Sequence, residues 1–144
     1  MKKFNVLLLS VVALGMSVVS CSKDDKNDDA LKVPMGKWVY DKISQTSGGK
    51  TSQEQNFNNA SCDDLRYLNF KDSKSLEDGY VDTDCVLTPY QGTYTQKGND
   101  VKIVESDGLE LNYTLVSVTP TKLTVKQLDV KDSSIFYTIT FNKQ

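Results

Sequence analysis

The chain has 144 residues, with 17 basic and 19 acidic side chains and a formal net charge of −2 at pH 7. This slightly acidic balance argues against nucleic-acid binding, for which clustered basic residues are the expected signature. The chain contains no histidine, which excludes Ser-His-Asp triads, Cys-His pairs and histidine-based zinc sites, so we expect a protein that is not an enzyme and that uses no metal or cofactor.

The first residues are typical of a secretory signal peptide. Basic residues precede an apolar run over 6–19, which is followed by Ser20 and Cys21. A basic start, an apolar centre and small residues before the cleavage point define such signals. An uncleaved anchor is the alternative, but the run is shorter than the roughly 20 apolar residues that span a bilayer. We therefore predict that residues 1–20 are removed.

Two short motifs around this point indicate a membrane anchor and a compartment. Val18-Val19-Ser20-Cys21 resembles a bacterial lipobox, which implies that Cys21 is lipidated and becomes the new N-terminus. Two or more acyl chains there would anchor the protein stably. Ser22-Lys23-Asp24-Asp25 resembles the acidic signal that sends lipoproteins of some Gram-negative anaerobes to the outer leaflet of the outer membrane. These resemblances imply a surface-exposed outer-membrane lipoprotein of the bacterial cell envelope.

The segment 21–33 is expected to be a flexible tether. Residues 22–30 offer nothing apolar to offset the entropy lost on ordering. Its aspartates could be interpreted as calcium ligands, but the segment lacks the glycine turn and terminal glutamate of a calcium loop. A solvated spacer is the better interpretation. Residues 34–144 then form one domain with one core.

From residue 34 onward, short strands alternate with turns, and no stretch has the helical period of 3.6. Residues 45–62 and 82–90 are expected to be irregular loops. Regularly spaced strands indicate a sandwich or barrel, and an even count with short connections favours an antiparallel up-and-down β-barrel, which has no free edge. The predicted all-β fold has eight strands, at about 36–42, 65–70, 75–81, 92–96, 101–105, 109–115, 123–125 and 135–141.

Several segments of this domain resemble a known family. Gly36-Lys37-Trp38 is similar to the G-x-W signature of lipocalins, and the segments 68–72, 92–94 and 121–125 follow the same pattern. Together they resemble the lipocalin-like domains of bacterial surface lipoproteins, over about 34–142. The resemblance implies an eight-stranded lipocalin-like barrel, a fold that can enclose one small ligand.

Cys62 and Cys85 remain as an even pair if Cys21 carries lipid. In an oxidising compartment such a pair favours a disulfide, although two separate buried thiols are the alternative. In an eight-stranded meander the loops 45–62 and 82–90 lie at the same end of the barrel. That placement would bring the two cysteines within the distance that a disulfide needs.

Aromatic side chains are expected to line the interior. One hypothesis is a pocket for a small apolar or amphipathic ligand, entered at the end that holds loop 45–62. The other is a filled core, in which Trp38 plugs the closed end and tyrosine hydroxyls are satisfied near the rims. The candidate ligand-binding residues are Tyr40, Tyr94, Tyr113 and Tyr137.

We therefore expect a membrane-anchored, non-catalytic binding module for a small apolar or amphipathic ligand. The alternative is an accessory or structural surface lipoprotein that binds a partner protein of the envelope and has no ligand pocket. A roomy cavity lined by the inward aromatic residues would favour the first. A solid interior beneath an exposed apolar patch would favour the second.

Overall fold

The computed structural model describes residues 30–57, 62 and 65–144, so the predicted signal peptide, Cys21 and most of the predicted tether lie outside the described residues. The chain falls into two units, Met1–Ala30 and Leu31–Gln144, and the fold below is that of the second. The described residues contain no α-helix. Their strands are β1 (Gly36–Ser47), β2 (Lys50–Thr51), β3 (Gln55–Asn56), β4 (Tyr67–Phe70), β5 (Ser75–Val81), β6 (Leu87–Lys97), β7 (Asp100–Glu105), β8 (Glu110–Val118), β9 (Lys122–Leu128) and β10 (Ile135–Lys143).

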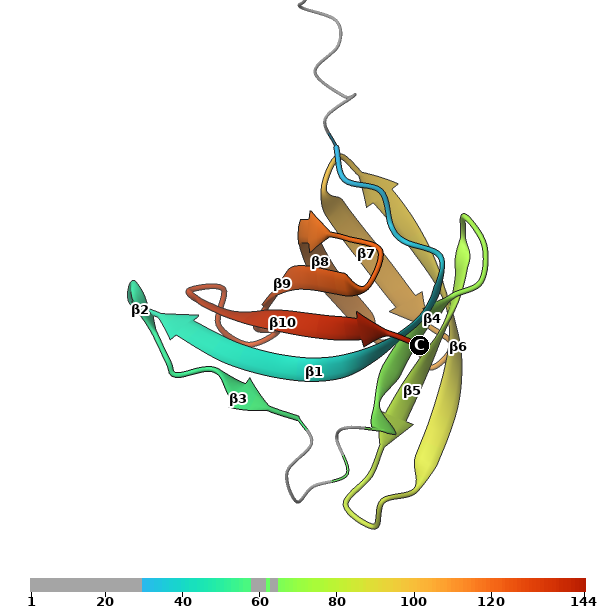
Figure 1. The fold of residues 1–144 in the computed structure, drawn as a ribbon, viewed down its shortest axis with the longest axis horizontal. Coiled ribbons are helices and arrows are strands. Elements are labelled where there is room, and N and C mark those ends of the chain that lie inside the picture. Colours follow the sequence, from blue (N-terminus) through green and yellow to red (C-terminus); the bar gives the residue numbers. More distant parts are fainter. Residues whose placement is uncertain (1–29, 58–61, 63–64) are drawn as a thin grey trace, which may run out of the picture. The chain divides into compact units, whose positions relative to one another are not determined.

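Eight of these strands form a closed antiparallel barrel. They are joined in the order β1, β4, β5, β6, β7, β8, β9 and β10, and β10 pairs with β1 to close the ring. The closing pairing extends from Trp38 opposite Lys143 to Ser47 opposite Ile135. The short strands β2 and β3 pair only with β1, beyond the end of β4 (Figure 1). The prediction of an eight-stranded up-and-down lipocalin-like barrel is confirmed.

Two strands extend into stretches that were predicted to be irregular loops. β1 continues to Ser47, where a loop was expected, and β6 begins at Leu87 within the predicted irregular stretch. In both cases the backbone pairs with a distant partner, because Gln45 lies opposite Tyr137 and Tyr90 lies opposite Asp78. Ladder hydrogen bonds of this kind satisfy the backbone whatever the side chains are, so polar composition alone did not indicate them.

One end of the barrel is filled and covered. We call it the closed end, because it holds the turns at 71–74, 98–99 and 119–121. Residues 31–34 run from the turn between β6 and β7 to the start of β1 (Figure 1). The Leu31 amide donates to Asn99 Oδ1 over 2.8 Å. The side chain of Val33 is buried in the core, so the barrel unit begins slightly before the boundary expected at residue 34.

Trp38 packs inside the closed end, as the G-x-W resemblance implied. Its side chain is only 1 % exposed, and the indole Nε1 donates to the Pro34 carbonyl oxygen over 3.1 Å. The Lys143 ammonium lies 5.5 Å from the indole ring. The other most completely buried side chains in the described part of the chain are Phe141, Leu68, Leu76, Ile103 and Leu123.

Replacing Trp38 with alanine should lower the free energy of unfolding by about 3–5 kcal/mol, because a large buried aromatic is lost and leaves a void. Urea unfolding followed by far-UV circular dichroism measures this, since Trp38 is the single tryptophan of the chain and its fluorescence disappears with it. Val130→Ala, at a side chain that is 76 % exposed, is the control and should cost less than about 0.5 kcal/mol. A cost below about 1 kcal/mol for Trp38→Ala would contradict the packing described here.

Candidate functional site

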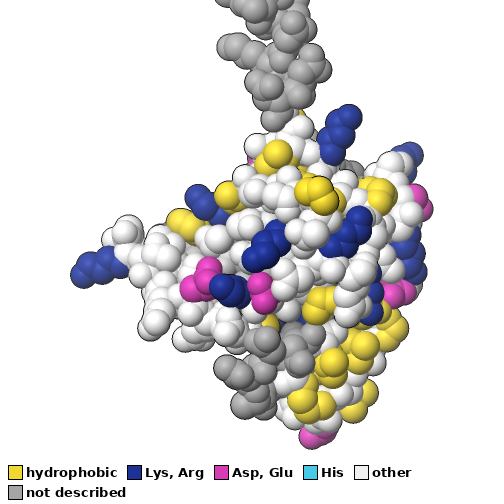
Figure 2. Space-filling view, in the orientation of Figure 1, with side chains coloured by type: hydrophobic (Ala, Val, Ile, Leu, Met, Phe, Trp, Pro, Cys, Tyr) yellow, Lys and Arg dark blue, Asp and Glu magenta, His cyan; other side chains and the backbone are white. Residues whose placement is uncertain are grey.

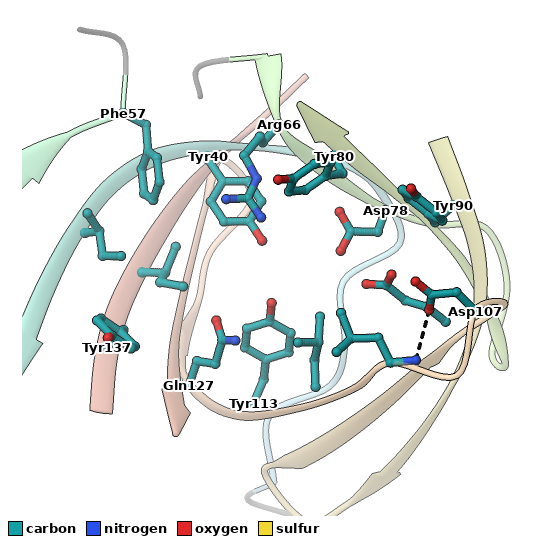
Figure 3. A pocket seen from close by; sticks show the side chains of 15 residues that line it. Tyr40, Phe57, Arg66, Asp78, Tyr80, Tyr90, Asp107, Tyr113, Gln127 and Tyr137 are labelled. Carbon is teal, nitrogen blue, oxygen red and sulfur yellow. Dashed lines mark hydrogen bonds between the residues drawn. The ribbon is translucent and has the colours of Figure 1, made fainter. Parts of the chain in front are cut away.

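A cavity of about 410 Å³ opens at the end of the barrel opposite the closed end. Its volume lies within the range of about 300–1,000 Å³ that is typical of small-molecule sites. Figure 3 shows the side chains that surround it. They are Tyr40, Ile43, Phe57, Arg66, Asp78, Tyr80, Tyr90, Glu105, Asp107, Leu109, Leu111, Tyr113, Gln127, Tyr137 and Ile139.

Three of the four candidate tyrosines line this cavity: Tyr40, Tyr113 and Tyr137. Tyr94 does not. Its ring packs edge-on against Phe70 with centroids 5.2 Å apart, and its hydroxyl donates to the Asp72 carbonyl oxygen over 2.7 Å. Asp72 belongs to a turn of the closed end, so Tyr94 is part of the filled core. The alternation of β6 placed Tyr94 inside the barrel correctly, but it did not indicate its depth along the barrel axis.

Tyr40 and Tyr113 form the floor of the cavity. Their hydroxyls point toward each other (Figure 3). Burial raises the pKa of Tyr40 to about 12 and raises the pKa of Tyr113 well above its ordinary value. Both phenols therefore stay neutral and can donate hydrogen bonds. The ring of Tyr40 also packs against Phe141, with centroids 4.5 Å apart, which joins the floor to the core below it.

Two acidic residues that the sequence analysis did not single out are buried beside this floor. Asp78 of β5 is 4 % exposed and Glu105 of β7 is 8 % exposed. Strand alternation turns both inward, because Asp78 follows Leu76 by two positions and Glu105 follows Ile103 by two. An acidic residue in phase with buried apolar neighbours was the signal that could have revealed them.

The two carboxyl groups lie close enough for each to influence the pKa of the other. Burial, together with the Asp78 carboxyl, raises the pKa of Glu105 to about 7. Burial likewise raises the pKa of Asp78, against the opposing effect of the Arg66 guanidinium. Both carboxyl groups therefore hold a proton more tightly than free carboxyl groups do, at the edge of a cavity that is open to solvent.

Arg66, the single arginine of the sequence, lies over the aromatic rings at the mouth of the cavity (Figure 3). Its guanidinium carbon is 4.9 Å from the ring centroid of Tyr40 and 5.3 Å from that of Tyr80. Its backbone carbonyl oxygen accepts from the Tyr40 amide over 3.1 Å. This contact fixes the start of β4 against β1.

A disulfide between Cys62 and Cys85 connects the segment before β4 with the loop between β5 and β6, at the open end. The two α-carbons are 5.5 Å apart, which is an ordinary distance for a disulfide. The predicted bridge is confirmed. Asp82 organises the loop that carries Cys85, because its Oδ1 accepts from the amides of Asp84 and Val86. The rim of the cavity is therefore held on this side by a covalent bond.

The lining combines apolar and polar groups in a way that suits binding more than catalysis. Ile43, Leu111 and Ile139 provide apolar contact area, while the buried carboxyl groups of Asp78 and Glu105 come from β5 and β7. No cluster of three or more potential metal ligands occurs among the residues that the structure describes. In the same residues, no helix is long and apolar enough to cross a membrane.

Comparisons with known proteins point to one family. A family model described as "Lipocalin-like domain" matches residues 35–125. The crystal structure of a lipocalin-like protein from Bacteroides uniformis is similar to this chain with a TM-score of 0.51 and 17 % identity, over 76 % of this chain and 97 % of that one. An uncharacterized protein from Bacteroides eggerthii gives a TM-score of 0.50 and 15 % identity, over 76 % and 98 % of the respective chains. At these identities the structures support the fold alone. None of the curated proteins has a significantly similar sequence.

The raised pKa of Glu105 predicts how stability depends on pH. Because the folded state holds this proton more tightly than the unfolded chain, the free energy of unfolding should fall as pH rises from about 4.5 to about 7. Glu105→Gln cannot ionise and should lose less stability between pH 5 and pH 8 than the wild type does. Chemical unfolding at both pH values measures the difference.

Glu110→Gln is the matched control, because Glu110 is an exposed residue of β8 that pairs with Lys102 on the outside of the barrel. It should keep the wild-type pH dependence. If Glu105→Gln and the wild type lost the same stability over this range, Glu105 would not be a buried acid with a raised pKa.

Proposed function

The chain belongs to the lipocalin-like domain family, and from this premise we propose that it is a non-catalytic binding module for a small amphipathic ligand, anchored to the outer membrane through a lipid on Cys21. Proteins of this family are generally binding proteins without enzymatic activity. The observation that carries the proposal is the open cavity of about 410 Å³ at one end of a barrel whose other end is filled.

The composition of the cavity supports an amphipathic ligand. Ile43, Leu111 and Ile139 offer one apolar wall, and burying a ligand's apolar part against them would stabilise the complex by about 25 cal/mol per Å². The tyrosine hydroxyls and the carboxyl groups of the lining can orient a polar group. Sites of this kind, mostly apolar with a few convergent polar groups, are typical of small-molecule binding.

The anchor is supported by the sequence motifs at 18–25, which lie outside the described residues. Residues 31–34 lie at the closed end, so a tether that precedes them joins the barrel opposite the cavity mouth. An extracytoplasmic location also suits the Cys62–Cys85 disulfide, since such bonds persist in oxidising compartments.

A surface for a partner protein is the second candidate function. Apolar side chains gather over the hairpin of β5 and β6, at the lower right of Figure 2. The exposed ones include Tyr80, Val86 and Leu87, with exposed fractions of 46 %, 54 % and 40 %. Exposed apolar patches of this kind often mark interaction surfaces. The cavity argues against a partner-binding protein whose barrel has no ligand pocket.

Native mass spectrometry of the full chain, purified from the bacterial envelope in mild detergent, tests both parts of the proposal. The covalent mass should correspond to loss of residues 1–20 with acyl groups added at Cys21, and Cys21→Ala should lack this addition. A small molecule should also be bound non-covalently and be released at higher collision energy. Leu111→Trp should lose that molecule because the indole occupies the cavity, whereas Val116→Trp, at an exposed position of the same strand, should retain it.

Each part can fail separately. An identical acyl mass in Cys21→Ala and in the wild type would overturn the anchor. A wild-type chain free of any bound molecule, or equal occupancy in Leu111→Trp and Val116→Trp, would contradict a ligand in the cavity and favour the partner-protein surface.

A further inference from the structure

Two buried side-chain atoms in the described part of the chain lack a hydrogen-bond partner: Asp78 Oδ1 and Arg66 Nε. Both residues line the cavity. An unpaired polar atom under the surface costs about 1–3 kcal/mol, so native proteins satisfy nearly all such atoms. Asp78 Oδ1 is an acceptor, so a donor group on a bound ligand would complete it.

The geometry around Asp78 favours a cation as that group. Asp78 is 4 % exposed, and its carboxylate points into the cavity, toward the space above Tyr113 (Figure 3). The Glu105 carboxyl, 8 % exposed, lines the same cavity. Two carboxyl groups that meet at the edge of an open cavity present several acceptor oxygens to one small donor.

Arg66 is the single cationic side chain among the residues that line the cavity, and it offsets the charge of this pair only in part. Three carboxyl groups line the cavity, against the single guanidinium of Arg66. That guanidinium lies over the rings of Tyr40 and Tyr80 rather than in an ion pair. The ring faces of the tyrosines that line the cavity attract cations. The other titratable side chains that line the cavity are Asp107, Tyr90, Tyr113 and Tyr137.

We propose that the cavity binds an amphipathic amine, whose ammonium group is held between the carboxyl groups of Asp78 and Glu105 and whose apolar body lies against Ile43, Leu111 and Ile139. This inference rests on the proposed binding function and specifies the chemical class of the ligand. Hydrogen bonds between an ammonium and buried carboxylates are shorter and stronger than those between neutral groups. A carboxylate ligand would instead meet like charge at the same place.

Binding should be coupled to release of a proton. Burial makes both carboxyl groups hold protons more tightly, and an ammonium group that binds between them displaces a proton to solvent. Because burial raises the pKa of both Asp78 and Glu105, acidification keeps the pair protonated and competes with the ligand. An alkylamine keeps its charge over this range, since the pKa of such amines is about 10. Affinity for an amine should therefore rise with pH, whereas affinity for a neutral analogue should not.

A matched set of probes tests the proposal: phenethylamine, phenethyl alcohol and phenylpropionate, which share one apolar body. Dissociation constants are measured by isothermal titration calorimetry on the full chain in lipid nanodiscs, with empty nanodiscs as the blank. At pH 8 the amine should bind about tenfold or more tightly than the alcohol and the acid, as expected for hydrogen bonds to charged groups. At pH 5 this preference should shrink, while the alcohol's affinity stays constant.

Asp78→Asn and Glu105→Gln should each reduce the preference for the amine over the alcohol toward one, and Glu110→Gln on the outer surface should leave it unchanged. A preference that survives both substitutions, shows no pH dependence or favours the acid would overturn the proposal. All three probes could bind equally well to the wild type and lose binding in Leu111→Trp. That result would overturn the proposal of an amine ligand and leave the binding function intact. Binding of none of them would also refute the amine, and the bound mass found by native mass spectrometry would then decide the function separately.

Discussion

The pairing of β1 with β10 is the constraint on which the rest of the structure depends. It closes the sheet into a ring and so creates a single interior. The same two strands supply both kinds of interior, since Trp38 and Phe141 fill the closed end while Ile43 and Tyr137 reach the cavity. Without this pairing the inward residues of both strands would face water and the cavity would have no wall.

The barrel is therefore divided along its axis. In β8, Leu115 is buried in the core, Tyr113 forms the floor of the cavity and Leu111 lines its wall. A fully packed barrel would be more stable, because empty space forfeits contacts between side chains. An unfilled half with buried carboxyl groups at its edge is the kind of local cost that proteins carry at functional sites, and it links the fold to the proposed binding of a ligand.

Sequence patterns predicted much of this architecture and less of the site. Strands with strict alternation, such as β8 and β10, were predicted, and so was the Cys62–Cys85 bridge. The continuation of β1 through Gln45 was not, because only its distant partner Tyr137 specifies it. Alternation gives the face on which a residue lies but not its depth, so Tyr94 was grouped with the cavity tyrosines. Asp78 and Glu105 were missed because acidic residues are ordinarily exposed, although their phase with buried neighbours indicated the interior.

The central claim, that one half of the barrel is filled and the other open, is tested most directly by adding volume to each half. Leu111→Phe and Leu115→Phe make the same change at two inward positions of β8. We expect Leu111→Phe to lower the free energy of unfolding by less than about 1 kcal/mol, because the ring enters the cavity, and Leu115→Phe to lower it by about 1–3 kcal/mol, as overpacking of a filled core does. Equal costs at the two positions would contradict this account, because they would mean that the barrel is packed uniformly from end to end.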